Sequence, residues 1–494
     1  MNYCFLPEIS NRYVDAFFTL MVNPKLSQNL TFADGINLKN LICMHLTKEE
    51  QLLATGKIPA LFRKFAIPGV IGLLFIGLQP MIDGAVLGNF VGTEALASIN
   101  IFVPIYTFMS ALAVVVGVGC QAIVGMALGS KDYVKAHSAF KTAFGSLLVL
   151  ALVMGCAFVL AAEPLCRFLG ANEVLLPYTV SYVRAFSLFF PFMLLTFLCD
   201  YMLKAMGRPN FAMLVLGGTV MLNLLLNLLF VGILGWATAG SGLATGIAFT
   251  TGFTVMAPAL LKKNSLVSLR KGCFSFRLLG QMTYNGSSEG LSELSAGITV
   301  FLFNWVMMKN WGEVGVAAFT AINYMLNLGV QMFVGLSDGI VPILSFNYGA
   351  GHLNRVKETL FLGFKTNATI GIILFCIMFF GNEFIVSQFF ADGGSHVLKI
   401  TSIGAAVCAF AFLLNGSNIL SSSFFTSLGD ARTSVLVSLQ RGLLFVVLGI
   451  MIYPVILGDN GVWLTVPLAE FFTFVSTVYL LRKRLKTWSV SVHA

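Results

Sequence analysis

The sequence predicts an all-α polytopic membrane protein with twelve transmembrane helices in two pseudo-symmetric six-helix bundles. Three observations support this: an apolar composition, twelve long apolar segments, and a repeat between the two halves of the chain. Of 494 residues, 57% are hydrophobic and only 10% are charged, whereas soluble domains carry about 25% charged residues. With a mean hydropathy of +0.87, the chain has too few charges to cover a soluble surface of its size.

The apolar segments are long enough to cross a bilayer as helices, which takes about 20 residues for each span. Several of them are longer, so we expect tilted helices or helices that extend beyond the bilayer. We predict spans near residues 65–90, 97–125, 138–161, 178–204, 211–233, 240–261, 278–308, 314–345, 359–380, 396–426, 433–457 and 462–481.

The basic residues of the connections predict the orientation. After residue 54, every Lys and Arg except Arg167, Arg184, Lys309 and Lys399 lies on one alternating set of loops and span ends. Because basic residues are retained on the cytoplasmic side, both termini should be cytoplasmic in a multi-pass protein of the plasma (inner) membrane. The net charge of +9 therefore reflects the membrane topology. We expect the protein to lie in a lipid bilayer and to bind no nucleic acid.

The two halves of the chain resemble each other in sequence. GTEALAS at 92–98 answers GEVGVAA at 312–318, and at the same offset residues 117–136 match residues 337–356. Parallel repeats of this kind are a known transporter architecture. The resulting domains are an N-terminal extension at 1–54, an N-terminal bundle at 55–265, a cytoplasmic linker at 266–277, and a C-terminal bundle with a cytoplasmic tail at 278–494.

The first 54 residues do not share the apolar pattern of the rest and show no clear signal peptide. Met44 begins the segment MHLTKEEQLLATGK, which has the character of a natural start. Two hypotheses stay open: Met44 is the true initiator and residues 1–43 are a mis-assigned extension, or the extension is genuine.

Motifs for several kinds of chemistry are missing from the sequence. It contains no Walker A motif, no HExxH and no Cys/His cluster with metal-binding spacing. The nine cysteines form no CxxC pair, and most lie inside apolar segments as small buried side chains. We therefore expect neither an enzyme nor a cofactor, apart from a coupling ion.

One acid lies inside the first predicted span. Placing Asp83 there costs a few kcal/mol even on lenient scales, so it is a functional candidate. Asn223 and Asn227 share one face of the fifth span, where they either join helices through hydrogen bonds or, together with Asp83, hold a proton or Na⁺. Pro68 and Pro80 predict a bend in the first span.

The second half offers a further set of polar residues. Glu289 and Glu293 share a face of the seventh span, and Arg441 and Glu470 lie deep in spans eleven and twelve. A buried Arg–Glu pair is the structural explanation for the last two, and a polar site is the functional one. Asp200 and Asp338 lie nearer the cytoplasmic span ends, where we expect easier solvation and no coupling role.

Several segments together resemble the multidrug and toxic compound extrusion (MATE) family, bacterial drug-efflux type, over residues 45–485. They are IDGAVLGNFVGTEALA, ALGSKDYVKA, NLLLN, NGSSEGLSELSAGITVFLFN, GLSDGIVPILSFNYGAGHLNRV and GVWLTVPLAE. The resemblance implies two six-helix bundles facing each other in a V, and export of organic cations in exchange for Na⁺ or H⁺. It also implies a coupling role for Asp83 and, in one proposed mechanism, a bend at Pro68.

This chain departs from the family at one position of the fifth span. Members with the fullest cation site read Asn-x-x-x-Asp there, whereas this chain reads Asn223-x-x-x-Asn227. The departure removes one carboxylate and favours a proton over sodium. If the ion is Na⁺, its ligands would be Asp83, Asn223 and Asn227.

We therefore predict a monomeric secondary active antiporter that exports organic cations or amphipathic drug-like small molecules in exchange for H⁺ or Na⁺. The alternative within the same superfamily is a flippase for a lipid-linked precursor, although such proteins often have a cationic central cavity. An intramembrane enzyme or an ion channel is the rival from another class, and among acids only Glu289 and Glu293 resemble a catalytic pair.

Overall fold

The computed structural model describes residues 48–262, 265–389 and 395–490, and these residues are mostly helical with no β-strand among them. The hypothesis about Met44 and most of the predicted extension at 1–54 lie outside the described residues. Helix α3 (Lys48–Thr55) is the first helix of the described residues, and residues 53–494 form one compact unit.

The first half of this unit corresponds to the predicted N-terminal bundle. It contains α4 (Ile58–Phe90), α5 (Thr93–Gly129), α6 (Tyr133–Leu160), α7 (Ala162–Phe168), α8 (Leu176–Ser187), α9 (Phe190–Ala205), α10 (Pro209–Asn227), the π-helix η2 (Leu228–Ile233) and α11 (Ala237–Leu261).

The second half begins with a helix of 74 residues, α12 (Phe276–Gly349). It is followed by α13 (Leu353–Phe380), α14 (Asn382–Phe389), α15 (Ser395–Ala409), α16 (Phe412–Ser427), α17 (Ala431–Leu439), the π-helix η3 (Gln440–Leu444), α18 (Phe445–Leu457), the 3₁₀-helix η4 (Asp459–Leu464) and α19 (Thr465–Val490).

The number of spans agrees with the twelve predicted. Nine helices of the described residues are long and apolar enough to cross a membrane, or eleven if each of two bent helix pairs is one span. A straight α12 would be about 110 Å long, far more than a bilayer core of about 30 Å. The backbone of α12 leaves the helical conformation at Gly312, with φ 62° and ψ −147°, so its two arms make two spans.

Two predicted spans are not the single helices that we expected. Residues 178–204 form α8 and α9, which are bent by 56°, and residues 396–426 form most of α15 and α16, which are bent by 49°. Pro191 in the first turn of α9 explains the first break, because proline lacks the N–H that would continue α8. In contrast, α4 is one continuous helix that contains Pro68 and Pro80.

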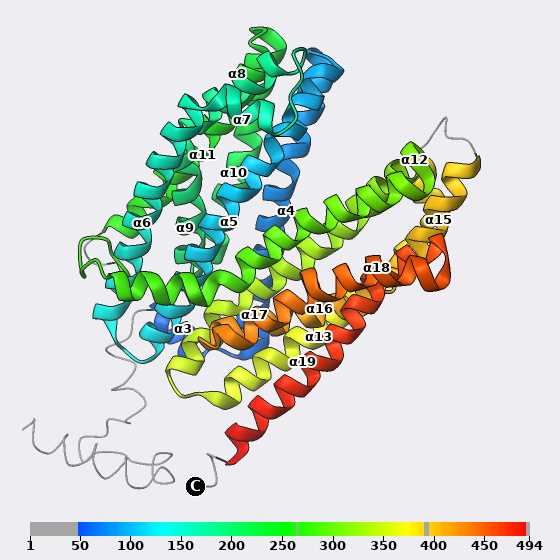
Figure 1. The fold of residues 1–494 in the computed structure, drawn as a ribbon. Coiled ribbons are helices and arrows are strands. Elements are labelled where there is room, and N and C mark those ends of the chain that lie inside the picture. The colour runs from blue at the N-terminus through cyan, green and yellow to red at the C-terminus, as the bar shows by residue number, and fades with distance from the viewer. Residues whose placement is uncertain (1–47, 263–264, 390–394, 491–494) are drawn as a thin grey trace, which may run out of the picture. The chain divides into compact units, whose positions relative to one another are not determined.

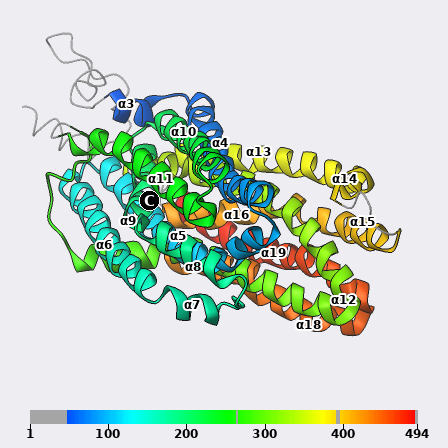
Figure 2. The same ribbon diagram turned by 90° about the horizontal axis from the view of Figure 1, so that it is seen from above.

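The two halves form separate groups of helices that meet mainly along α4, α5 and α12 (Figures 1 and 2). Glycines allow this close approach. A Cβ atom on Gly335 would lie 2.7 Å from the Cα of Val70, and one on Gly286 would lie 2.8 Å from the carbonyl carbon of Val115. Small residues let membrane helices pack backbone against backbone, and here they join one half to the other.

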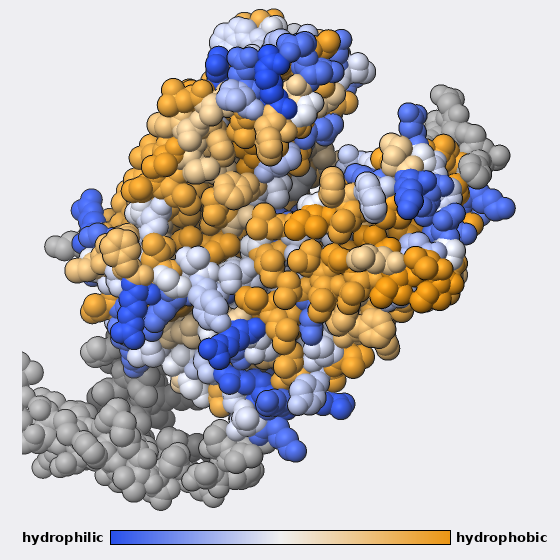
Figure 3. All heavy atoms as spheres, viewed as in Figure 1, coloured by the Kyte–Doolittle hydropathy of each residue, from blue (hydrophilic) through white to orange (hydrophobic). Residues whose placement is uncertain are grey.

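These contacts lie toward one end of the unit, which we call the basic end. At this end α5 and the second arm of α12 finish side by side, because Gly129 packs against Phe346. The turns after α5 and α9 carry the basic residues Lys131 and Arg208, and the first turn of α13, which follows α12, carries Arg355. Hydrophobic side chains cover the middle of the visible face of both groups, and hydrophilic ones gather at their ends (Figure 3).

Candidate functional site

The predicted membrane acid Asp83 lies inside the first half, on α4. Its side chain is only 3% exposed. The surrounding helices α8, α10 and α11 each direct a polar side chain toward it. No ion pair of Asp83 occurs among the residues that the structure describes. Its charge is therefore balanced by hydrogen bonds alone.

Both carboxylate oxygens of Asp83 accept hydrogen bonds. The Nδ2 atoms of Asn223 and Asn227 donate to Oδ1 at 3.1 and 2.7 Å. Thr245 Oγ1 donates to Oδ2 at 2.9 Å, and the Tyr182 hydroxyl does so at 3.4 Å. The structure thus brings together the three residues that the sequence grouped, and it adds Tyr182 and Thr245, which we did not predict.

The sequence of α10 explains how two amides reach one carboxylate. Asn223 and Asn227 are four residues apart on one helix face, and Asn227 Nδ2 also donates to the Asn223 carbonyl at 3.1 Å. The helix then changes to the π-helix η2 directly after Asn227. π-Helical turns often occur at functional sites, and this one follows the last contact of α10 with Asp83.

Two buried amide oxygens of the residues that bond to Asp83, Asn223 Oδ1 and Asn227 Oδ1, have no hydrogen-bond partner among the described residues. They give the site spare acceptors in addition to the carboxylate. Yet the amide nitrogens, and not these oxygens, face Asp83. Na⁺ takes oxygen ligands, so in the present arrangement the amides stabilise an ionised Asp83 and do not offer their oxygens to a cation. An amide would have to turn to bind Na⁺ or to accept a hydrogen bond from a protonated Asp83.

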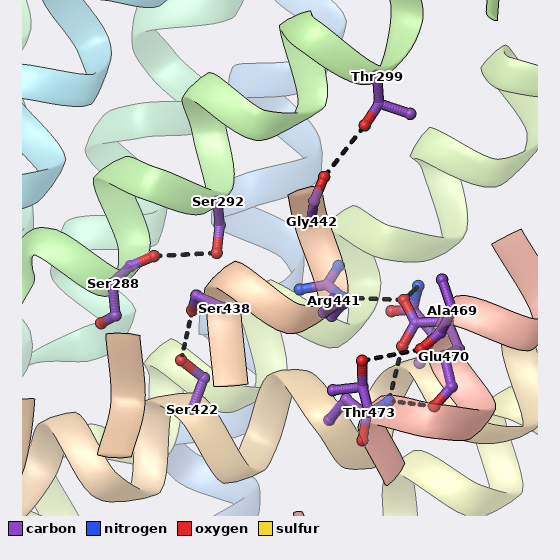
Figure 4. Close-up of polar contacts among 12 residues, drawn as sticks. Ser288, Ser292, Thr299, Ser422, Ser438, Arg441, Gly442, Ala469, Glu470 and Thr473 are labelled. Carbon is purple, nitrogen blue, oxygen red and sulfur yellow. Dashed lines mark hydrogen bonds and ion pairs between the residues drawn. The ribbon is translucent and has the colours of Figure 1, made fainter. Parts of the chain in front are cut away.

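The second predicted polar set separates into two places, and Figure 4 shows the first of them, the pair of Arg441 and Glu470. Arg441 Nε on η3 pairs with Glu470 Oε1 on α19 at 2.9 Å. Asn415 and Asn418 of α16 also donate to the Glu470 carboxylate, at 2.9 and 2.7 Å. The pair is therefore well enclosed by hydrogen bonds within the second half, as the structural explanation required.

Glu289 and Glu293 do not join that pair. Ser423 Oγ donates to Glu289 Oε1 at 3.4 Å, and Glu289 is buried. Glu293 is exposed on the same arm of α12. One glutamate is buried and the other is exposed, so Glu289 and Glu293 do not form the catalytic pair that their spacing suggested.

Our expectation that Asp200 and Asp338 are easily solvated was wrong. Both lie near helix ends, where we expected water, yet they are only 4% and 6% exposed. The physical reason is that they lie where the two halves meet, since Asp338 is next to Gly339, which packs against Phe65 of α4. The position of a residue along its own span does not show whether another helix buries it.

Comparison with known proteins shows which family the chain is similar to. The family model MatE matches residues 68–229 and 295–451. The multidrug export proteins MepA of Staphylococcus haemolyticus and S. aureus (strain MSSA476) are 23% and 22% identical to this chain over 445 residues, covering 89% of it and 97% and 98% of their own lengths.

Solved structures show the same fold. A MATE crystal structure in the bent conformation has a TM-score of 0.84 at 22% identity and covers 91% of this chain and 100% of its own. An outward-facing multidrug resistance MATE transporter of the MOP superfamily has a TM-score of 0.81, also at 22% identity, and covers 89% of this chain and 98% of its own. With the family model matching more than half of its residues, the chain belongs to the multidrug and toxic compound extrusion (MATE) family.

Proposed function

We propose that this protein is a secondary active exporter of organic cations or amphipathic small molecules, driven by the return of a coupling ion. The observation that carries the proposal is Asp83, a membrane carboxylate that accepts four hydrogen bonds without a cationic partner. Membrane acids of this kind are costly and mark ion pathways. The names of the staphylococcal relatives, which are multidrug export proteins, support the substrate class.

The position of Asp83 suits an ion that arrives from outside. The basic end is cytoplasmic if the distribution of Lys and Arg follows the positive-inside rule. Asp83 lies 25 residues beyond Ile58, where α4 begins at that end, so it is about 38 Å farther along the helix. In the present structure the halves contact each other near the basic end. A proton from the opposite side therefore has the shorter route to the site.

The coupling ion that we propose is H⁺. A proton on Asp83 neutralises the charge that the four donors now balance, and the new O–H needs an acceptor. Asn223 Oδ1 and Asn227 Oδ1 are buried and free, so one amide can turn and accept it. The turned amide accepts a hydrogen bond from Asp83 where it donated one before, and this changes the hydrogen bonds between α4 and α10. The ion biases the inward- and outward-facing states only to the extent that it binds one of them better.

Efflux from proteoliposomes under separately imposed H⁺ and Na⁺ gradients tests this proposal. An organic cation such as ethidium serves as the substrate, and the expected result is export driven by the H⁺ gradient and lost in Asp83→Asn. Glu94→Gln, an exposed acid at the start of α5, is the matched control and should transport normally. Export driven by Na⁺ alone would reject the proton, and export unchanged in Asp83→Asn would reject the role of this acid.

A further inference from the structure

A second group of buried charges lies where the two halves meet. It consists of Asp200 and Lys204 on α9 in the first half, and Glu289 and Asp338 on the two arms of α12 in the second. We call these four residues the interface cluster. Their exposed fractions are 4%, 4%, 9% and 6% in that order, so all four are withdrawn from water even though three of them are acids.

Contacts connect the cluster across the interface. Lys204 Nζ pairs with Asp200 Oδ2 at 2.6 Å, and its charge also attracts Asp338 of the other half. On the second-half side, Ser423 Oγ of α16 donates to Glu289 Oε1 at 3.4 Å, and Asp338 lies close to the same hydroxyl. Lys204 therefore pairs with an acid of its own helix, and its charge also favours the presence of the Asp338 carboxylate on α12.

The charges of the cluster do not balance. Three carboxylates face one ammonium group, and the nearby Arg441, which also attracts Glu289, already donates to Glu470. The other titratable neighbours are Tyr201 and the acid Glu293, neither of which supplies a positive charge.

Two oxygen atoms of the cluster are also unsatisfied. Asp200 Oδ1 and Asp338 Oδ1 are buried and have no hydrogen-bond partner in the part of the chain that the structure describes. A buried carboxylate that lacks partners is costly as an anion. A proton on one of these oxygens removes the charge and supplies the missing donor. A metal ion is not indicated, because no group of three or more His, Cys, Asp or Glu among the described residues has metal-binding geometry.

The cluster exists only while the halves are in contact. Next to it, Gly286 packs against Val115, Gly119 against Met282, and Gly339 against Phe65, each joining one half to the other. If the halves separate at the basic end, α9 moves away from α12. The carboxylates then gain water, and they no longer need protons to offset their burial.

We propose that the interface cluster is a proton-binding latch on the basic end. Closure of that end transfers protons from water to carboxylate oxygens of the cluster, and opening returns them. The closed state therefore holds more protons, so acid favours closure and alkaline conditions favour opening. The proposal rests on the proposed function only in requiring the basic end to open, and it does not depend on which ion Asp83 binds.

The test measures the closed fraction without substrate or transport. Spin labels at Ser130→Cys and His352→Cys, exposed positions in the turns after α5 and α12, report the separation by double electron–electron resonance. The native cysteines are replaced, and the protein is in nanodiscs between pH 5.5 and 8.5. The closed-to-open ratio should rise on acidification, by up to about tenfold per pH unit for each proton taken up.

Two variants should move this ratio in opposite directions. Asp338→Asn removes a buried charge, so it should raise the closed fraction at pH 8 and flatten the pH dependence. Lys204→Gln removes the only ammonium of the cluster, so it should lower the closed fraction at pH 8 and shift closure to more acidic pH. A merely structural role would make both variants loosen the interface in the same direction.

Glu163→Gln is the matched control, because Glu163 is an exposed acid on α7 and should leave the curve unchanged. Parallel shifts of Asp338→Asn and Lys204→Gln, or curves that superimpose on wild type, would overturn the latch. Because no transport is measured, loss of coupled efflux in Asp83→Asn bears on the proposed function alone.

Discussion

Asn227 Nδ2 lies 2.7 Å from Asp83 Oδ1, although 144 residues separate the two in the chain. The contact joins α10 to α4, the first helix of the first half. At a position where related proteins with the fullest cation site have an acid, this chain places an amide donor against the carboxylate. The consequences of this one difference can be measured.

Asn227→Asp should make the protein respond to sodium. Two carboxylates at this distance repel each other unless a cation or a proton lies between them, and the free Asn223 Oδ1 adds an oxygen ligand. We expect NaCl, relative to choline chloride at equal ionic strength and neutral pH, to raise the melting temperature of the variant in detergent. The wild-type protein should show no such difference, and equal melting temperatures for the variant in both salts would contradict the interpretation.

Arg441→Met should destabilise the second half more than its partial exposure suggests. The change leaves Glu470, which is 4% exposed, with two amide donors but no cation. Breaking a buried pair on one side typically costs about 3–5 kcal/mol. Equilibrium unfolding in mixed micelles should show a loss near the lower figure. Arg441→Met combined with Glu470→Leu should lose less than the sum of the single changes, and additive losses would contradict a coupled pair.

Gly286→Ala should hold the halves apart at the basic end. The added methyl would lie 2.8 Å from the Val115 carbonyl carbon, and overpacking of this kind costs about 1–3 kcal/mol. The spin-label pair at positions 130 and 352 should report a larger open fraction. Gly280→Ala is the matched control on the same helix, because nothing lies within 4 Å of its added methyl. A distance distribution that stays unchanged in Gly286→Ala would show that this contact does not limit closure.

The sequence predicted the architecture well, because membrane spans depend on apolar length and loop charge. It also grouped Asp83 with Asn223 and Asn227, because helical periodicity places the two amides on one face. Thr245 and Tyr182 gave no comparable signal. A single hydroxyl in an apolar helix usually bonds to its own backbone, as Thr250 does to Gly246, so only the packing of α8 and α11 shows that these two reach Asp83.

The errors have a common cause in contacts between distant segments. The burial of Asp200 and Asp338 depends on the other half of the molecule, which neither local sequence contains. Asn415 and Asn418 are different, since their spacing of three residues on α16 already places two amides on one face. That signal was available in the sequence and would have predicted partners for Glu470.

The most direct test of the central claim follows protons together with substrate. Proteoliposomes that contain a trapped pH indicator receive an organic cation on the side that exposes the basic end, without an imposed gradient. Wild-type protein should move protons opposite to the substrate, giving a pH change that depends on substrate. Asp83→Asn should bind the substrate yet give no pH change, because its amide cannot take up a proton. A pH change of wild-type size in Asp83→Asn would contradict the account.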